Sequence, residues 1–363
     1  MKVCHITSVH PNRDVRILYK ECASLAKNGY DVYLVAQGES FEENDVKVIG
    51  FRPPGSRFER FLRTTKIAYK TATTIDADIY HLHDPELLLY ANKLKKLNKI
   101  VIFDSHEDVP KQIMAKTWLP AFLRPCISFV YKHYENKKVK NLDAVITVIE
   151  SIGDRIQKYN KNIVLVKNYP IIGDIVCNND NFSGRDRIIC YAGYLSELRG
   201  IRNAVKAMVK INGRLILAGK MSETFKNTLT ILPGWSQVKA VGVLDRKGLN
   251  TLYNKSMVGL CTLLNAPNHY NSLATKMFEY MSAEIPVVCS DFPLWKEVIE
   301  KNNCGICVDP NNIDAIVNAI NYLLNNPDIA RQMGRKGRQA VLEKYNWDVE
   351  EKKLVDLYKS LTQ

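Results

Sequence analysis

The chain has 363 residues, of which 46% are hydrophobic and 25% are charged, and its formal net charge is +13. This length and composition predict a soluble globular protein with two domains. No apolar run reaches the roughly 18 residues of a membrane-spanning helix, and the start lacks the apolar region of a signal peptide, so we expect a cytoplasmic protein.

The positive charge favours an anionic partner, such as nucleic acid, an anionic lipid surface or a phosphorylated substrate. No stretch resembles a nucleic-acid module or alternates aromatic and basic residues as RNA-binding proteins do, so we expect no nucleic-acid partner. The nine cysteines lie mostly in apolar runs and indicate buried thiols. Cys304 and Cys307 have a C-x-x-C spacing, but without a second pair or a nearby histidine they predict no metal site.

Strand and helix patterns alternate along the whole chain. In the first part, strands are predicted at 2–8, 31–36, 46–51, 79–83, 100–103, 144–148 and 163–166. A polar stretch at 171–187 is predicted to be a linker, and strands resume at 188–192, 215–218, 238–241, 258–261, 287–289 and 305–308. Helical segments fill 311–361, and we expect the closing helix, about 345–363, to pack back on the first domain.

Repeated strand–helix units predict parallel sheets with helices on both faces. The fold class is therefore α/β, with two doubly wound, Rossmann-like domains at 1–170 and 188–344 that face a cleft between them. Ligands in such folds bind beyond the carboxyl ends of the strands. The polar residues in those positions are His10, Asp14, Asp84, Glu86, His106, Glu107 and Arg199. The alternative is that strand ends are loops, which are polar in any case.

The stretch 273–291, LATKMFEYMSAEIPVVCSD, predicts a helix followed by a buried strand. Lys276 and Glu279 are three residues apart and share one helix face near its N-terminus. A phosphate would fit against Lys276 and the free N–H groups there, while Glu279 accepts hydrogen bonds from hydroxyl groups. This pattern suits a nucleotide. The alternative is an ordinary amphipathic helix with a surface ion pair.

Several motifs, taken together and in this order, resemble the family-4 retaining glycosyltransferases (glycosyl transferases group 1), which have the GT-B fold. These motifs are TSVHPNRDVRI, HLHDPELL, FDSHED, YAGYLSELRGI and NSLATKMFEYMSAEIPVVCSDFPLWKEVI, and the final Tyr345-Asn346-Trp347 also fits. The resemblance covers nearly the whole length. It implies a hexosyl- or glycosyltransferase that takes a sugar from a nucleotide-sugar donor, a UDP- or GDP-sugar.

The resemblance implies that the second domain holds most of the donor. Arg199 and Lys276 would bind the diphosphate and offset its charge, so no metal ion or other cofactor is expected. His106 matches a family histidine beside the transferred sugar, and these three residues form the predicted catalytic set. The predicted donor-binding residues are Glu279, Asn271, Thr275, Glu297 and Gly193, with Glu279 on the ribose. The predicted acceptor-side residues are Asp14 and Glu107.

The chain departs from the family pattern at three places. Asn271 stands eight positions before Glu279, where relatives often carry a glutamate, and we interpret this as a subgroup trait. Residues 8–12, SVHPN, replace a glycine-rich turn, and Tyr194 replaces a frequent arginine. Arg199 and Lys276 would therefore carry more of the phosphate charge.

For retention, the resemblance implies front-face attack, with a donor phosphate oxygen taking the acceptor's proton. Two stretches, 52–70 and 111–140, mix basic and aromatic residues and suit an anionic membrane surface. We therefore hypothesise a peripheral enzyme that acts on a lipid-linked glycan at the inner face of a bacterial plasma membrane, in capsule or O-antigen synthesis. The alternative is that these helices pack their apolar faces on the first sheet.

Other functions remain open from the residues alone. A sugar-nucleotide epimerase or a glycosyl phosphorylase uses the same fold, and Asn271 motivates a non-catalytic nucleotide-sugar-binding subunit. A nicotinamide dehydrogenase is disfavoured because neither domain has a G-x-G-x-x-G turn after its first strand.

Overall fold

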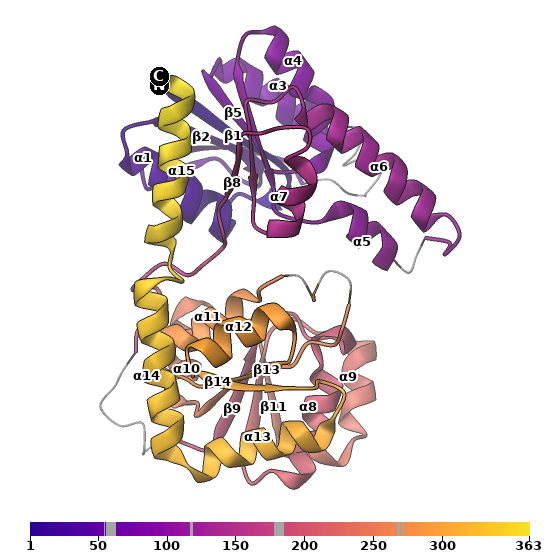
Figure 1. The fold of residues 1–363 in the computed structure, drawn as a ribbon, viewed down its shortest axis with the longest axis vertical. Helices are drawn as coiled ribbons and strands as arrows, with labels where there is room; N and C mark the ends of the chain where they lie inside the picture. The colour runs from indigo at the N-terminus through magenta and orange to yellow at the C-terminus, as the bar shows by residue number, and fades with distance from the viewer. Residues whose placement is uncertain (54, 56–62, 117–118, 178–184, 267–268, 271) are drawn as a thin grey trace. The chain divides into compact units, whose positions relative to one another are not determined.

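The fold is described from a computed structural model of the chain, which describes residues 1–53, 55, 63–116, 119–177, 185–266, 269–270 and 272–363. The chain divides into two compact units (Figure 1). The first comprises Met1–Asn168 and Asp348–Gln363, and the second comprises Tyr169–Trp347. Each unit is built around its own sheet.

The first unit has an eight-stranded sheet in the order β3-β4-β2-β1-β5-β6-β7-β8. The strands are β1 Lys2–Pro11, β2 Asp31–Gln37, β3 Phe41–Glu43, β4 Val46–Phe51, β5 Ile79–Leu82, β6 Ile100–Ser105, β7 Ala144–Thr147 and β8 Ile163–Leu165. β3 pairs antiparallel with β4, whereas the central strands pair in parallel. β5 and β7 are buried at every position, as expected for parallel strands covered on both faces.

Helices cover this sheet. They are the π-helix η1 Val15–Cys22, α1 Ala23–Lys27, α3 Thr65–Ile75, η3 Pro85–Leu87, α4 Leu88–Lys96, α5 Val109–Ala115, α6 Arg124–Val139, α7 Glu150–Ile156 and α15 Trp347–Thr362. The last of these returns to the first unit, where Tyr358 is fully buried. Within the described ranges, every helix is too short or too polar to cross a bilayer.

The second unit has a six-stranded parallel sheet in the order β11-β10-β9-β12-β13-β14. Its strands are β9 Ile188–Ala192, β10 Arg214–Ala218, β11 Val238–Gly242, β12 Val258–Cys261, β13 Val287–Ser290 and β14 Gly305–Val308. Its helices are η5 Glu197–Arg199, α8 Ile201–Ala207, η6 Met208–Lys210, α9 Glu223–Thr230, η7 Pro233–Gln237, α10 Arg246–Lys255, α11 Thr275–Ser282, α12 Pro293–Lys301, α13 Ile313–Asn325 and α14 Pro327–Glu343. The predicted α/β class with two doubly wound parallel sheets is confirmed.

The stretch 171–187, expected to be a linker, belongs to the second unit instead. Ile175 is buried in the core of that unit, and the backbone of Val176 bonds to Asn250 and Asn254 of α10. A polar stretch can pack in this way because amide side chains satisfy its backbone groups. Residues 178–184 lie outside the described part of the chain.

Candidate active site

In each unit the strand order reverses beside the first strand. β1 lies between β2 and β5, and β9 lies between β10 and β12. Successive loops then leave the sheet in opposite directions, which opens room for a ligand at the carboxyl ends of those strands. Several candidate site residues of each unit lie near this edge.

In the second unit, α11 begins at this edge. Ala274 precedes the helix in an extended conformation and has no polar side chain to cap it, so the first N–H groups remain available to an anion. Lys276 lies in the first turn, and its Nζ is 3.7 Å from the centroid of the Tyr191 ring on β9. The aromatic face holds the ammonium group by a cation–π contact.

Gly193 follows β9 directly and makes room for that lysine. Its φ of +129° is one that other residues rarely adopt, and a Cβ there would lie 3.0 Å from Lys276 Nζ. The Gly193 N–H donates to the carbonyl of Ala218 at 2.8 Å, which fixes the turn at the strand end. The structure thus brings together two of the predicted residues, Gly193 and Lys276.

Arg199 supplies a second positive charge nearby. It ends η5, and the next residue, Gly200, presses so closely on β12's end that a Cβ would lie 1.8 Å from the Thr262 carbonyl oxygen. Burial lowers the pKa of Lys276, and the charge of Arg199 lowers it further, to about 8, against the opposing effect of Cys261. Two cations that repel each other beside a free helix N-terminus form a site suited to an anion.

Glu279 lies one helical turn after Lys276 and Thr275. Its Oε2 accepts a hydrogen bond from the Tyr253 hydroxyl at 2.8 Å, and its Oε1 lies 3.2 Å from Arg246 Nη1. Burial and the Glu279 charge raise the pKa of Tyr253, so that hydroxyl stays a donor. The carboxylate is held in place, and its remaining lone pairs are free to accept from hydroxyl groups of a ligand.

Tyr280 anchors α11 to the sheet. Its hydroxyl accepts from the Ala192 N–H at 3.1 Å and donates to the Leu260 carbonyl at 3.3 Å, so it bridges β9 and β12. Its ring occupies the space above Gly259, where a Cβ would lie 2.4 Å away. The motif that carries Lys276 and Glu279 thus also carries the residue that positions them.

In the first unit, Asp84 bonds to the last part of β1. This buried carboxylate accepts from Thr7 Oγ1 at 2.8 Å and from the Ser8 N–H at 2.5 Å, and it lies 3.2 Å from His10 Nδ1. Burial opposes ionisation, but the bonds from His10, Ser8 and Thr7 lower the pKa of Asp84 overall. Burial would likewise lower the pKa of His10, yet the bond to Asp84 raises it overall.

His106 follows β6 and lies beside His10, with ring centroids 5.1 Å apart in an edge-to-face arrangement. Its Nδ1 is 3.6 Å from Asp104 Oδ2. Asp104 is itself fully buried and held by Arg16, whose Nε and Nη2 lie 2.9 and 3.2 Å from its oxygens. Burial opposes ionisation of Asp104, but the Arg16 charge holds its pKa well below the usual range.

The comparisons with known proteins cover both units. Residues 15–168 match the family described as Glycosyltransferase Family 4, and residues 176–340 match the family described as Glycosyl transferases group 1. The two segments follow one another and together take up most of the chain. The chain belongs to this glycosyltransferase family.

Similar proteins agree with this assignment. An uncharacterised glycosyltransferase of Methanocaldococcus jannaschii is 23% identical, over 99% of this chain and 98% of that protein. Alpha-maltose-1-phosphate synthase of Mycolicibacterium smegmatis is 23% identical over 48% of each. The sequence resemblance, the GT-B fold and the prediction of a transferase are confirmed.

Solved structures share the whole fold. Sucrose-phosphate synthase of Thermosynechococcus elongatus has a TM-score of 0.80 at 18% identity, covering 100% of this chain and 99% of that one. Anabaena HepE, solved with UDP and glucose, has a TM-score of 0.76 at 12% identity, covering 99% and 100%. At these identities the likeness concerns the fold.

The contacts of the remaining predicted residues of this glycosyltransferase do not indicate a ligand-binding role. Glu297 lies on α12 and forms a surface ion pair with Lys301 at 2.7 Å. Asp14 caps η1, since its Oδ1 accepts from the Arg16 and Ile17 N–H groups. Glu107 is exposed beside His106, and Asn271 lies outside the described residues. Their roles stay predictions.

Sequence reasoning did not assign roles to the residues that position the site. Tyr191, Tyr253 and Arg246 hold Lys276 and Glu279, while Asp84 and Arg16 hold His10 and Asp104. The signals for Asp84 were its place after a strand and inside the quoted motif HLHDPELL. The signal for Tyr280 and Arg16 was their place inside quoted motifs.

Proposed function

We propose that this glycosyltransferase transfers a sugar with retention from a UDP- or GDP-sugar to a glycan acceptor. The observation that carries the proposal is the pair of cations, Lys276 and Arg199, at the uncapped start of α11. Such a site is unfavourable when empty and is stabilised by a diphosphate. The solved structures of HepE with UDP and with UDP-glucose support a nucleotide-sugar donor.

In this proposal the donor diphosphate lies on Lys276, Arg199 and the first N–H groups of α11. The two cations offset the charge that builds on the departing diphosphate, so the reaction needs no metal ion there. Glu279 accepts hydrogen bonds from the ribose hydroxyls, and Thr275 adds a hydroxyl at the helix start. Gly193 allows the backbone and the lysine to share the space next to the phosphates.

For retention, a donor phosphate oxygen takes the proton from the acceptor hydroxyl, and the protein contributes position and charge. His106 donates a hydrogen bond to the transferred sugar in this scheme. Its orientation is supported by Asp104, which lies close to Nδ1. Asp14 and Glu107 are proposed to face the acceptor.

The His10–Asp84 pair favours a second candidate mechanism. A histidine held by a buried, ionised carboxylate is a competent general base. If His10 removes the acceptor's proton, the attack comes from the opposite face and the product has inverted configuration. NMR assignment of the anomeric proton in the product distinguishes the two mechanisms, because retention excludes this role for His10.

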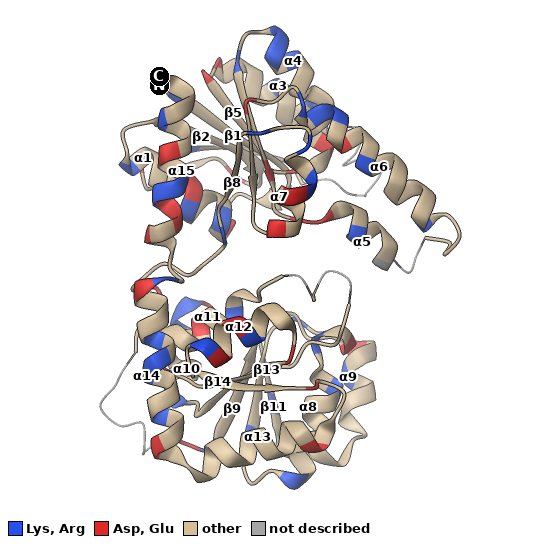
Figure 2. Cartoon of the chain, viewed as in Figure 1, with Lys and Arg blue, Asp and Glu red and all other residues tan. Residues whose placement is uncertain are grey.

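A lipid-linked acceptor in bacterial cell-surface polysaccharide synthesis is supported by α6. The first half of this helix and the preceding loop expose Phe122, Phe129 and Val130, with exposed fractions of 79%, 62% and 61%. Arg124 and Lys132 lie among them, and Figure 2 shows α6 as largely uncharged with scattered basic positions. Apolar and basic side chains together suit an anionic membrane surface.

The stretch 52–70 gives weaker support for a membrane surface. In α3, Ala68, Ala72 and Ile75 are buried, so the helix packs its apolar face on the sheet. Residues 54, 56–62 and 117–118 of the two stretches lie outside the described residues. Sedimentation with phosphatidylglycerol vesicles at low salt tests the proposal. We expect Phe129→Asp to reduce binding, whereas an unchanged bound fraction contradicts a membrane role for α6.

The donor is tested by a thermal-shift and calorimetric screen with UDP, GDP and their sugars, followed by turnover measurements with the ligand that binds. Selective binding raises the melting temperature. Lys276→Met is expected to abolish the shift. An unchanged shift in melting temperature in this variant would contradict the proposed diphosphate site.

A further inference from the structure

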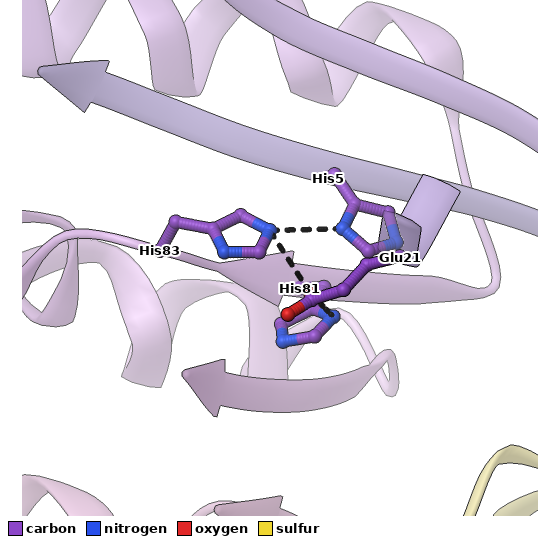
Figure 3. Close-up of side chains that lie close together, drawn as sticks. All are labelled: His5, Glu21, His81 and His83. Atoms are coloured by element: carbon purple, nitrogen blue, oxygen red, sulfur yellow. Dashed lines mark hydrogen bonds and ion pairs between the residues drawn. The ribbon is translucent and has the colours of Figure 1, made fainter. Parts of the chain in front are cut away.

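The core of the first unit contains a cluster of metal-binding side chains that the proposed reaction does not use. His5 comes from β1, His81 from β5, His83 from the residue after β5, and Glu21 from η1 (Figure 3). All four side chains are fully buried. One donor atom from each lies within 4.8 Å of the others.

The fold places these residues on one side of the sheet. His5 and His81 are partners in the parallel pairing of β1 and β5, and His83 follows His81 by two positions. Partners across a sheet and residues two apart along a strand point to the same face. Two imidazoles therefore come from paired strands and the third from the residue directly after β5, and η1 brings Glu21 against them.

Two polar atoms of the cluster have no hydrogen-bond partner within the described part of the chain. They are Glu21 Oε2 and His81 Nε2, whereas Glu21 Oε1 lies 2.9 Å from Arg16 Nε. Most buried polar side-chain atoms in folded proteins form at least one hydrogen bond. Glu21 Oε2 lies 3.9 Å from both His81 Nδ1 and His83 Nε2, too far for hydrogen bonds. A buried carboxylate oxygen is therefore aimed into the imidazoles without a bond to them.

The charges around the cluster do not balance either. Glu21 and Asp104 are two buried carboxylates, and Arg16 lies 2.9 Å from both, as the cation that pairs with them. One further positive charge is required to offset the second carboxylate in a low-dielectric interior. Either a proton or a metal ion can supply it.

We propose that His5, His81, His83 and Glu21 bind a divalent transition-metal ion of the Zn²⁺ class, which stabilises the first unit. Imidazole nitrogens and carboxylate oxygens are ligands that Zn²⁺ accepts, and three of the first with one of the second would fill its four coordination positions. Ligand atoms in such a site are roughly 3.3 Å apart, given metal–ligand distances near 2 Å. The four donor atoms lie within 4.8 Å of one another, so shifts on the order of 1–1.5 Å close the set. His5 Nδ1 and His83 Nε2 share a hydrogen bond at 2.9 Å, and the metal would replace the proton of that bond.

The surroundings fit an outer layer of supporting groups. Asp104 Oδ2 lies 3.4 Å from His83 Nδ1, the nitrogen on the side away from His5. The Tyr358 hydroxyl of α15 lies 3.5 Å from His5 Nε2, the nitrogen on the side away from His83. A carboxylate and a hydroxyl in these two places orient metal-binding imidazoles. The same hydroxyl bonds His81 Nδ1 at 2.9 Å, and metal binding through that nitrogen would replace this bond. The proposal is independent of the donor site, because its residues all belong to the first unit.

The test uses the full chain, produced without a histidine tag in zinc-supplemented medium, because a fully buried site fills during folding. Metal analysis is expected to give about one zinc per chain, and refolding with ZnCl₂ should raise the melting temperature above that reached with EDTA. His83→Asn and Glu21→Gln should each lower the bound zinc about tenfold or more. His133→Asn is the matched control, since His133 is exposed on α6 and should leave the zinc content unchanged.

Co²⁺ refolded into the unmodified chain supplies a measurement that needs no variant. The visible spectrum should show ligand-field bands of nitrogen and oxygen donors, without the strong near-ultraviolet bands of thiolate ligands. Thiolate bands would overturn the proposal in favour of the cysteines. Absence of stoichiometric zinc together with equal melting temperatures in ZnCl₂ and EDTA would overturn it in favour of a proton shared by Glu21 and the imidazoles.

Discussion

The two units treat charge in opposite ways beside their parallel strands. In the second unit, Lys276 and Arg199 are two neighbouring cations beside a free helix N-terminus, and they leave positive charge for a ligand to neutralise. In the first unit, Arg16 lies 2.9 Å from both Asp104 and Glu21, so a cation of the chain itself offsets the charge of one of these two buried carboxylates. We call Lys276 and Arg199 the open set, because a bound anion must supply their counter-charge. We call Arg16 with Asp104 and Glu21 the closed set, because these side chains pair with one another inside the core.

This comparison predicts different consequences when a cation is removed. Arg16→Met should lower the free energy of unfolding by about 3–5 kcal/mol, because it leaves buried carboxylates without their partner. The measurement is chemical denaturation of the full chain. Arg13→Met is the control, since Arg13 pairs with Glu43 at the surface and should change stability by no more than about 1 kcal/mol. Equal losses of stability in the two variants would contradict the claim that Arg16 stabilises the core.

Removing a cation from the open set should leave the stability of the fold undiminished and lower the activity. Lys276→Met should lower kcat/KM about 10²–10³-fold, or about 3–4 kcal/mol, because it removes a charge that stabilises the leaving diphosphate. Its unfolding free energy should stay the same or rise, since the repulsion with Arg199 is relieved. Lys210→Met is the control, because Lys210 forms an exposed pair with Asp314. Loss of stability in place of activity would show that Lys276 is structural.

Glu279 tests how the open site recognises hydroxyl groups. Glu279→Gln should weaken nucleotide binding by about 1.5–3 kcal/mol, because a charged acceptor becomes neutral while the side chain keeps its shape. Calorimetry with the nucleoside diphosphate measures this. Glu223→Gln, at an exposed pair with Lys226, should leave the affinity unchanged. A nucleotide that carries 2′,3′-dideoxyribose should bind more weakly than the ordinary nucleotide to the unmodified protein. If the affinity falls by the same factor in Glu279→Gln, Glu279 does not bind the ribose hydroxyls.

The pH dependence gives the smallest effect and carries a definite sign. Lys276 has a pKa of about 8 in the fold against an ordinary 10.5, so the unfolded chain binds more protons between these values. The free energy of unfolding of the ligand-free protein should therefore rise with pH in this window. Diphosphate affinity should fall as pH rises above 8, by at most about tenfold per unit, because the amine loses its charge. Both trends should disappear in Lys276→Met, and trends that persist there belong to another group.

Much of the fold and part of the site were present in the sequence. The alternation of apolar strands and amphipathic helices predicted the α/β class, and the predicted strands at 46–51 and 188–192 coincide with β4 and β9. The motif around Lys276 and Glu279 predicted a helix followed by a buried strand, and α11 and β13 are found there. These predictions succeeded because strand and helix periods, and the face that residues share on a helix, are local properties of the chain.

Only the tertiary structure decided which distant residues surround that motif and the strand ends. Tyr191 under Lys276, Asp84 beside His10, and the meeting of His5 with His83 all depend on strand order and register. The stretch 171–187 looked like a linker because its side chains are polar, yet Ile175 and its backbone bonds tie it to the second unit. A sequence specifies periods over a few residues, whereas contacts across some 75 residues or more arise when parallel strands pair and bring their carboxyl ends to one edge.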